Sequence, residues 1–260
     1  MPETDVDALD LAVSLTLVAV AVALSAWRRL GLEVGIAWAA VRAIAQLLAV
    51  GAVLAAIIGP DQPVAWSWLW VALMAVVAAD VVRRRAPEVP GLFPLAAGAF
   101  TASAAVTMGV LFGLGVFPLE SRTVVPLAGL MVGNSMQATV LAARRVVEEV
   151  RDKREEVEAR LALGHGSDEA ARPYVRQALR TALTPQIEST RTVGLIALPG
   201  AMTGLVLAGV DPVDAVLVQI VVMFLVLAAA ATSSSVVGMG TTRRLFTLDH
   251  RLLPLPRPRS

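Results

Sequence analysis

The chain has 260 residues, of which 57% are hydrophobic and 17% charged, with no cysteine and a formal net charge of +1. Soluble domains contain about 45–50% apolar and about 25% charged residues, so a water-soluble enzyme is nearly excluded because too little polar surface is available to cover the apolar mass. The lack of cysteine excludes a disulfide scaffold, a thiolate metal site and a thiol nucleophile.

Seven apolar stretches are long enough to cross a membrane as helices. A bilayer core about 30 Å thick needs roughly 20 apolar residues per helix. The sequence has no apolar–polar alternation typical of strands. We therefore predict an all-α, polytopic membrane protein that forms one transmembrane domain over residues 1–260. The predicted spans are residues 9–26, 34–58, 64–82, 91–117, 124–143, 193–209 and 213–238.

The positions of the basic residues predict the orientation of these spans. Of the 22 Lys and Arg, all except Arg42 and Arg122 follow spans one, three, five or seven. Basic loops stay in the cytoplasm, so we predict an outside N-terminus and a cytoplasmic C-terminus in the inner (plasma) membrane. The acidic leader is unlike a signal peptide, and span one is expected to be retained. The predicted outer segments carry acids: Glu3, Asp5, Asp7, Asp10, Asp61, Glu120, Asp211 and Asp214.

Residues 144–191, between spans five and six, form the one substantial segment predicted to lie in the cytoplasm. Residues 144–163 contain neither Gly nor Pro and carry ion pairs in the favourable i,i+4 order, such as Glu156 with Arg160. This pattern indicates that the helix of span five continues past the membrane.

The sequence then predicts a short helix at the end of this extension. Gly164 ends the first helix, and Ser167 is a suitable N-cap for a new helix over residues 167–172. Pro173 is expected to end that helix, and a further helix is expected to end at Pro185. A short helix exposed at such a tip is either gripped by a partner outside the membrane or is a solvated hairpin without one.

The sequence offers no means of binding ATP within this chain. Lys153 is the one lysine, and no glycine-rich phosphate loop precedes it. The two histidines, His165 and His250, lie in predicted loops without a metal-binding or triad pattern. We predict that the chain is not an enzyme and holds no cofactor of its own, so that any ATP-driven process requires a second polypeptide.

Polar residues inside the predicted spans are candidates for a transport path, because polar groups are unfavourable in a bilayer. In span five, Asn134 and Gln137 follow Pro126, Gly129 and Gly133. Either the helix breaks there and lines a cavity, or the glycines allow a close helix–helix contact with Asn134 hydrogen-bonding across it. The path candidates are Asn134, Ser135, Met136, Gln137, Met202, Thr203, Arg42 and Gln46.

Two further features bear on this path. Pro199, Gly200 and Gly204 interrupt span six, and interrupted spans are typical of transport paths. Arg42 either extends its guanidinium to the inner surface or faces the bundle interior with Gln46, where it would attract an anionic cargo. No carboxylate lies deep in a span, so a metal cargo would be held weakly, as a chelate or at the rims.

Several sequence blocks resemble the FetB/YbbM-type permeases of ABC transporters, which include a bacterial iron exporter and plant aluminium-tolerance half-transporters. Residues 158–164 are similar to the EAA-type loop of ABC permeases, although Arg160 stands where that loop has Ala. Pro173 and Ala201 also depart from the family pattern. The other matching blocks are residues 42–47, 126–136, 180–185, 192–204, 208–212 and 219–220.

The resemblance implies a permease, as a homodimer, that exports iron or a related metal species. A separate ABC ATPase subunit would bind ATP and Mg and move a coupling helix within residues 144–191. No nucleic-acid partner is implied. The alternatives are a permease for an anionic organic solute such as a nucleotide sugar, or an ATP-independent carrier. The coupling residues implied are Glu158, Leu161, Leu163, Gly164, Ser167, Asp168 and Glu169.

Overall fold

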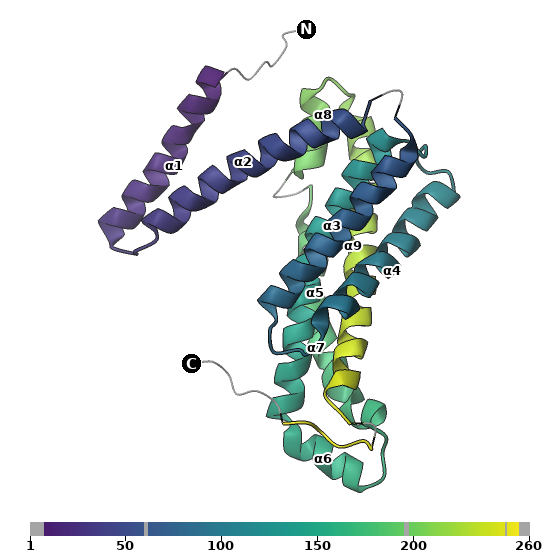
Figure 1. Cartoon of the computed structure of the whole chain (residues 1–260). Coiled ribbons are helices and arrows are strands. Elements are labelled where there is room, and N and C mark those ends of the chain that lie inside the picture. The colour runs from purple at the N-terminus through teal and green to yellow at the C-terminus, as the bar shows by residue number, and fades with distance from the viewer. Residues whose placement is uncertain (1–7, 60–61, 195–197, 248, 255–260) are drawn as a thin grey trace. The chain divides into compact units, whose positions relative to one another are not determined.

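A computed structural model of the chain describes residues 8–59, 62–194, 198–247 and 249–254 (Figure 1). Over these residues the chain forms helices and no strands, which confirms the all-α prediction. Part of the predicted outer acids (Glu3, Asp5, Asp7, Asp61) and residues 195–197 lie outside the described residues. The helices are α1 (Ala8–Arg28), α2 (Glu33–Ile57), α3 (Val64–Arg85), α4 (Leu92–Gly113), α5 (Ser121–Asp152), α6 (Arg154–Ala162), α7 (Ser167–Thr192), α8 (Gly200–Leu207) and α9 (Pro212–Arg244).

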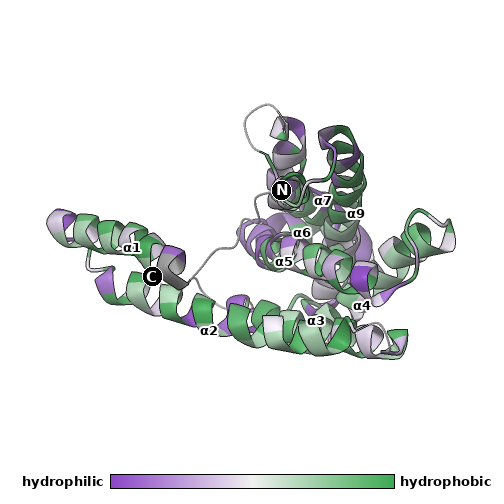
Figure 2. Ribbon diagram, turned by 90° about the horizontal axis from the view of Figure 1, so that it is seen from above, coloured by the Kyte–Doolittle hydropathy of each residue, from purple (hydrophilic) through white to green (hydrophobic). Residues whose placement is uncertain are grey.

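The chain divides into two compact units, Met1–Gln62 and Pro63–Ser260. In the first unit, α1 and α2 form a helical hairpin. Its turn is closed by the Ser25 hydroxyl, which donates a hydrogen bond of 2.8 Å to the Glu33 carboxylate. Most residues along both helices are exposed, and many are apolar, as their green colour in Figure 2 shows.

The second unit is a bundle in which α5 and α9 pack against each other along their length. Helices α3 and α7 pack on α5, while α4 lies against α3 and α9 (Figure 1). The start of α9 is fixed by Asp211, whose carboxylate accepts a hydrogen bond of 2.8 Å from the backbone N–H of Val213. Glu120 and Thr123 form a capping box that starts α5 in the same way.

Five helices among the described residues, α2, α3, α4, α5 and α9, are long and apolar enough to cross a membrane. The described part of α1 is apolar but shorter. These helices support a multi-pass membrane protein, while the count of seven spans and the orientation stay predictions. Within the predicted span 193–209 the structure forms α8, eight residues that begin at Gly200. The break at Pro199 and Gly200 was expected, but α7 ends before it, at Thr192.

The predicted helix boundaries around residue 173 are also wrong, because α7 continues through both Pro173 and Pro185. Both prolines lie on exposed positions of the helix. The face that includes Ala170, Ala171 and Tyr174 is buried, and this packing outweighs the backbone hydrogen bonds that the prolines remove. Ser167 is the first helical residue, and Gly166 occupies the N-cap position.

Helix α5 is likewise continuous through Pro126, so the predicted alternative of a broken span five is wrong. The predicted extension beyond the span is confirmed as far as Asp152, and a turn at Lys153 separates α5 from α6. At Gly129 the alternative of close packing holds in part, since an added Cβ would lie 3.4 Å from Met74 of α3. Asn134 does not bond across this contact, because its amide donates to Leu130 of its own helix.

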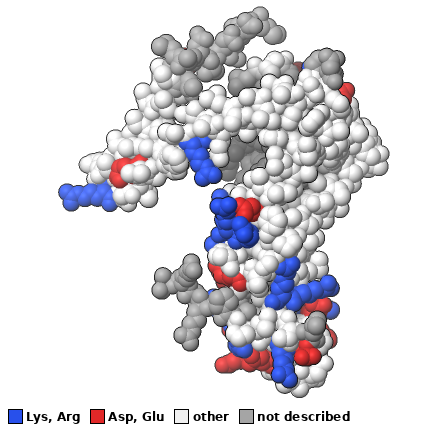
Figure 3. Space-filling model, viewed as in Figure 1, with Lys and Arg blue, Asp and Glu red and all other residues white. Residues whose placement is uncertain are grey.

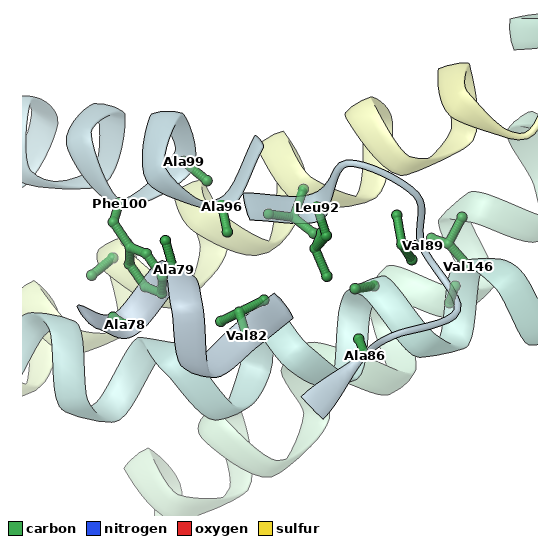
Figure 4. Close-up of a cluster of buried hydrophobic side chains, with 14 of the residues drawn as sticks. Ala78, Ala79, Val82, Ala86, Val89, Leu92, Ala96, Ala99, Phe100 and Val146 are labelled. Atoms are coloured by element: carbon green, nitrogen blue, oxygen red, sulfur yellow. The ribbon is translucent and has the colours of Figure 1, made fainter. Parts of the chain in front are cut away.

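Small residues hold the bundle together. Figure 4 shows alanines of α3 and α4, among them Ala79 and Ala96, lying against each other around Val82 and Phe100. All four of these side chains are fully buried. Because alanine lets helix backbones approach closely, van der Waals contact is gained without large side chains. The contact between α3 and α4 therefore depends on small side chains.

Charged side chains of the second unit gather at the end that carries α6, as Figure 3 shows. Asp80 on α3 accepts hydrogen bonds of 2.6 Å from both Arg83 and Arg84, which lie about one turn further along the helix. This polar end is the one predicted to lie in the cytoplasm.

Candidate transport path and coupling tip

A polar groove runs between α5, α7 and α9 within the second unit. It consists of two adjoining cavities of about 670 Å³ and 310 Å³, and Asn134, Gln186 and Ser189 line both of them. The larger volume falls in the range of small-molecule sites, about 300–1,000 Å³. We call these two cavities the α5–α7–α9 groove.

Helices α5 and α7 each supply a pair of polar side chains to this groove at helical spacing, and α9 supplies one. Asn134 and Gln137 lie one turn apart on α5, and Gln186 and Ser189 lie one turn apart on α7. Gln219 comes from α9. The continuity of α7 through Pro185 is what places its polar pair beside α5. Amides and hydroxyls both donate and accept hydrogen bonds, so this lining suits a polar or hydrated cargo.

Gln219 is the most unusual member of the groove. The residue is 5% exposed, and its carbonyl oxygen Oε1 has no hydrogen-bond partner among the described residues. A buried polar atom without a partner costs about 1–3 kcal/mol. A side chain retained under this penalty on an otherwise apolar stretch of α9 is a functional candidate.

The electrostatics of the groove favour anions over bare cations. Arg85 and Arg144 line the larger cavity, and neither has an ion-pair partner among the described residues. The described residues that line the two cavities include no Asp or Glu. Over the described part of the chain, no three His, Asp or Glu side chains come together in a way that could hold a metal ion. A metal cargo would therefore meet neutral oxygen and nitrogen donors, and Met223 in the smaller cavity.

The structure places the predicted path residues in different surroundings. Asn134 and Gln137 line the groove. Ser135 is buried on another face of α5, where its hydroxyl donates to the Met131 carbonyl, and Met136 packs against the apolar core. Thr203 donates to the carbonyl of Pro199 at the start of α8.

The remaining predicted path residues do not line the groove as described. Met202 is half-buried on α8, whose neighbours Gly200 and Ala201 line the smaller cavity. Arg42 and Gln46 are exposed one turn apart on α2, in the first unit. Their part in a path stays a prediction.

Gln186 and Ser189 were not among the predicted path residues, because the sequence places them in the predicted cytoplasmic segment, after a helix expected to end at Pro185. Gln219 was named only within a block that resembles the permease family, residues 219–220, and not as a path residue. A signal was present, since a glutamine within the apolar stretch of α9 is the kind of residue that the argument from membrane polarity selects.

A second feature is the α6–α7 tip, formed by α6, residues 163–166 and the first turn of α7. Gly164 has φ +90°, a left-handed conformation that favours glycine and reverses the chain here. Leu163 beside it is 80% exposed. A large apolar side chain at the apex of a charged tip is suited to contact with a partner protein.

The other predicted coupling residues surround this apex. Leu161 is half-buried and packs against the core, whereas Glu158 is paired with Arg154 at 2.7 Å. Glu169 lies 3.3 Å from His165. Asp168 lies 3.8 Å from Arg243 at the end of α9, and Ser167 is described below with its contact to the C-terminal segment.

The base of the tip is held by a polar cluster outside the apolar spans. Lys153 and Tyr174 donate hydrogen bonds of 2.8 and 2.9 Å to the two carboxylate oxygens of Glu156. These hydrogen bonds, that from Lys153 first, hold the pKa of the Glu156 carboxyl below its usual value of 4.5. Val157, the next residue of α6, is fully buried. The Tyr174 hydroxyl of α7 thus holds α6 against α7.

The C-terminal segment after α9 caps this structure. The backbone N–H of Ser167 donates to His250 Nδ1 at 3.2 Å, and the Ser167 hydroxyl lies 3.1 Å from the same atom. The segment folds back on itself, since the N–H of Leu253 donates to the Leu245 carbonyl. His250 therefore ties the start of α7 to the end of α9.

The comparisons with known proteins agree with one another. A family described as "Uncharacterised protein family (UPF0014)" matches residues 8–246. "UPF0014 membrane protein STAR2" of rice is 43% identical over 217 residues, 84% of this chain and 76% of its own. "UPF0014 membrane protein YjkA" of Bacillus subtilis is 36% identical over 246 residues, 95% of this chain and 98% of its own.

A third relative has a name that states a function. "Probable iron export permease protein FetB" of Escherichia coli is 35% identical over 243 residues, which cover 94% of this chain and 93% of the relative. No solved structure matches the chain.

Proposed function

The chain belongs to the UPF0014 family of membrane proteins, and from this premise we propose that it is the membrane-spanning permease subunit of an ABC transporter. Its cargo is iron or a related metal species, which it exports. A separate ABC ATPase subunit binds ATP and Mg and supplies the energy. Two copies of the permease work with two copies of the ATPase.

The structure of the α6–α7 tip is the main support for an ATPase partner. It presents an exposed leucine, Leu163, on a rigid pair of helices at the charged end of the bundle. The EAA-like residues 158–164 lie on this tip. Helix α7 extends from the tip to the α5–α7–α9 groove, so a push on Leu163 is transmitted along one continuous helix to Gln186 and Ser189.

The name of the Escherichia coli relative supports iron as cargo and export as direction. The described lining of the groove offers amide, hydroxyl and thioether groups and no carboxylate. This lining suits a metal that keeps other ligands better than a bare cation, which carboxylates would bind. A metal species would cross with part of its ligand shell retained, bound loosely enough to leave.

A second candidate is an anionic organic solute, such as a nucleotide sugar. Arg85 and Arg144 in the larger cavity favour it, because unpaired guanidinium groups bind phosphate and carboxylate well. The double variant Arg85→Gln/Arg144→Gln separates the candidates. Organic-anion flux by the natural chain that the double variant loses identifies the second candidate as a cargo, whereas metal flux that the variant leaves unchanged supports the first.

Reconstitution tests the proposal. The chain is purified together with the ABC ATPase subunit that co-purifies with it, and both are placed in vesicles that trap a fluorescent iron chelator. We expect ATP-dependent movement of Fe²⁺ that is absent from vesicles holding the chain alone. Movement by the chain alone, without ATP, would identify an ATP-independent carrier and overturn the proposal.

A further inference from the structure

A different face of α7 borders a third cavity that the proposed function does not use. This α7–α9 groove has a volume of about 840 Å³ and lies between α7 and the end of α9. Its floor is apolar, and its rim is basic. The apolar side chains are Val175, Leu179, Leu183, Ile187 and Met239, and the charged ones are Arg172, Arg176, Arg180, Arg243 and Asp168.

The rim carries positive charge that the protein does not neutralise. Arg172, Arg176 and Arg180 are four residues apart on α7, so they share one face of the helix. None of the three has an ion pair among the described residues, whereas Arg154 on α6 is paired. The one acid of the groove, Asp168, faces the fourth arginine, Arg243 (N···O 3.8 Å).

Polarity changes along the groove in one direction. The arginines lie toward the α6–α7 tip, and Leu183 and Ile187 continue α7 away from it. At 1.5 Å per residue, Ile187 lies about 10 Å beyond Arg180 along the helix. Ile187 is 39% exposed, whereas the exposed Met239 lies beside the arginines, because its neighbour Gly238 packs on Leu179. The groove is therefore basic at one end and apolar and uncovered at the other.

Helix α9 shows where this change of polarity falls. It is one of the helices able to cross a membrane, and its last turn carries Arg243 and Arg244. The α7–α9 groove reaches from Met239, inside the apolar part of α9, to Arg243. The basic end of the groove accordingly lies at the level where the membrane meets water.

We propose that the α7–α9 groove binds an anionic phospholipid. The headgroup phosphate lies among Arg172, Arg176 and Arg180, whose guanidinium groups donate hydrogen bonds to phosphate oxygens. One acyl chain lies along Leu183 and Ile187. A second copy of the chain fits less well, because a two-fold contact through this face would set two rows of arginines against each other.

Native mass spectrometry of the full chain in detergent micelles tests this proposal. The protein is titrated with phosphatidylglycerol or with phosphatidylcholine of the same acyl chains. We expect at least tenfold tighter binding of the anionic lipid. The triple variant Arg172→Gln/Arg176→Gln/Arg180→Gln should lose this preference, and Arg176→Gln alone should weaken it roughly fivefold, the effect of one basic residue near a membrane surface.

Two controls define the outcome. The triple variant Arg145→Gln/Arg151→Gln/Arg154→Gln removes arginines that are each paired with an acid, and it should keep the preference. The double variant Ile187→Ser/Met239→Ser should weaken the binding of phosphatidylglycerol. Glycerophosphoglycerol, the headgroup without acyl chains, should not displace the lipid from the natural chain. Equal binding of both lipids by the natural chain would overturn the proposal. A dimer of the natural chain that the double serine variant alone abolishes would also overturn it, because a second copy of the chain would then cover the groove.

Discussion

The unpartnered carbonyl oxygen of Gln219 leads to a prediction in which stability and transport change in opposite directions. We expect the near-isosteric substitution Gln219→Met to stabilise the fold and to impair transport. Gln219 Oε1 is buried at the α5–α7–α9 groove without a partner among the described residues. A methionine fills the same volume and leaves no polar atom to be satisfied.

The magnitude follows from the price of burying one unsatisfied polar atom, about 1–3 kcal/mol. Removing it should raise the free energy of unfolding by about 1–2 kcal/mol, because the thioether loses part of the amide's other contacts. For a bundle of this size each kcal/mol corresponds to roughly 2–4 °C in Tm. Thermal unfolding in lipid nanodiscs measures the shift, and vesicle flux measures transport.

Ser234→Ala is the matched control. Ser234 is also fully buried on α9, and its hydroxyl has no partner among the described residues, but it does not line the α5–α7–α9 groove as described. We expect this variant to stabilise the fold without changing flux. If Gln219→Met instead destabilises the protein and leaves flux intact, Gln219 serves packing and not the cargo.

Three further predictions concern other contacts. A Cβ at Gly240 would overlap the Leu95 side chain, so Gly240→Ala should destabilise the bundle by about 1–3 kcal/mol in thermal melts. Gly98 has open space around it, so the control Gly98→Ala should be neutral or stabilising. His250→Ala should increase hydrogen exchange in the first turn of α7 without changing exchange in α4, because it removes the cap. Lys153 and Tyr174 keep the pKa of Glu156 below 4.5, so their hydrogen bonds to the ionised carboxylate stabilise the α6–α7 tip above that pH. Limited proteolysis of the tip should therefore increase as the pH falls below 4.5, and Glu156→Gln should abolish this pH dependence.

Much of the fold could be predicted from the sequence because hydrophobic length is a strong signal. The long apolar stretches became α2, α3, α4, α5 and α9. Predictions that depended on local helix breakers were weaker. Pro126, Pro173 and Pro185 all lie inside helices, since packing of the buried faces compensates for the missing backbone hydrogen bonds.

Part of the candidate site could be predicted because a polar residue within an apolar span is also a clear signal. Asn134 and Gln137 were found because they are polar within an apolar span. Gln186 and Ser189 were missed because their place in the groove depends on α7 running straight through Pro185, which the sequence did not indicate. The neighbours of Gln219 are set by the packing of α9 on α5, which no local pattern encodes.

The central claim is that a second polypeptide drives this membrane bundle through its α6–α7 tip. The most direct test is the number of iron ions moved per ATP hydrolysed in reconstituted vesicles, for the natural chain and for Leu163→Asp. Leu114→Asp, at a leucine of similar exposure after α4, is the control. The account predicts that this ratio falls at least tenfold for Leu163→Asp and stays unchanged for the control. An unchanged ratio for Leu163→Asp, with the ATPase still bound, would contradict it.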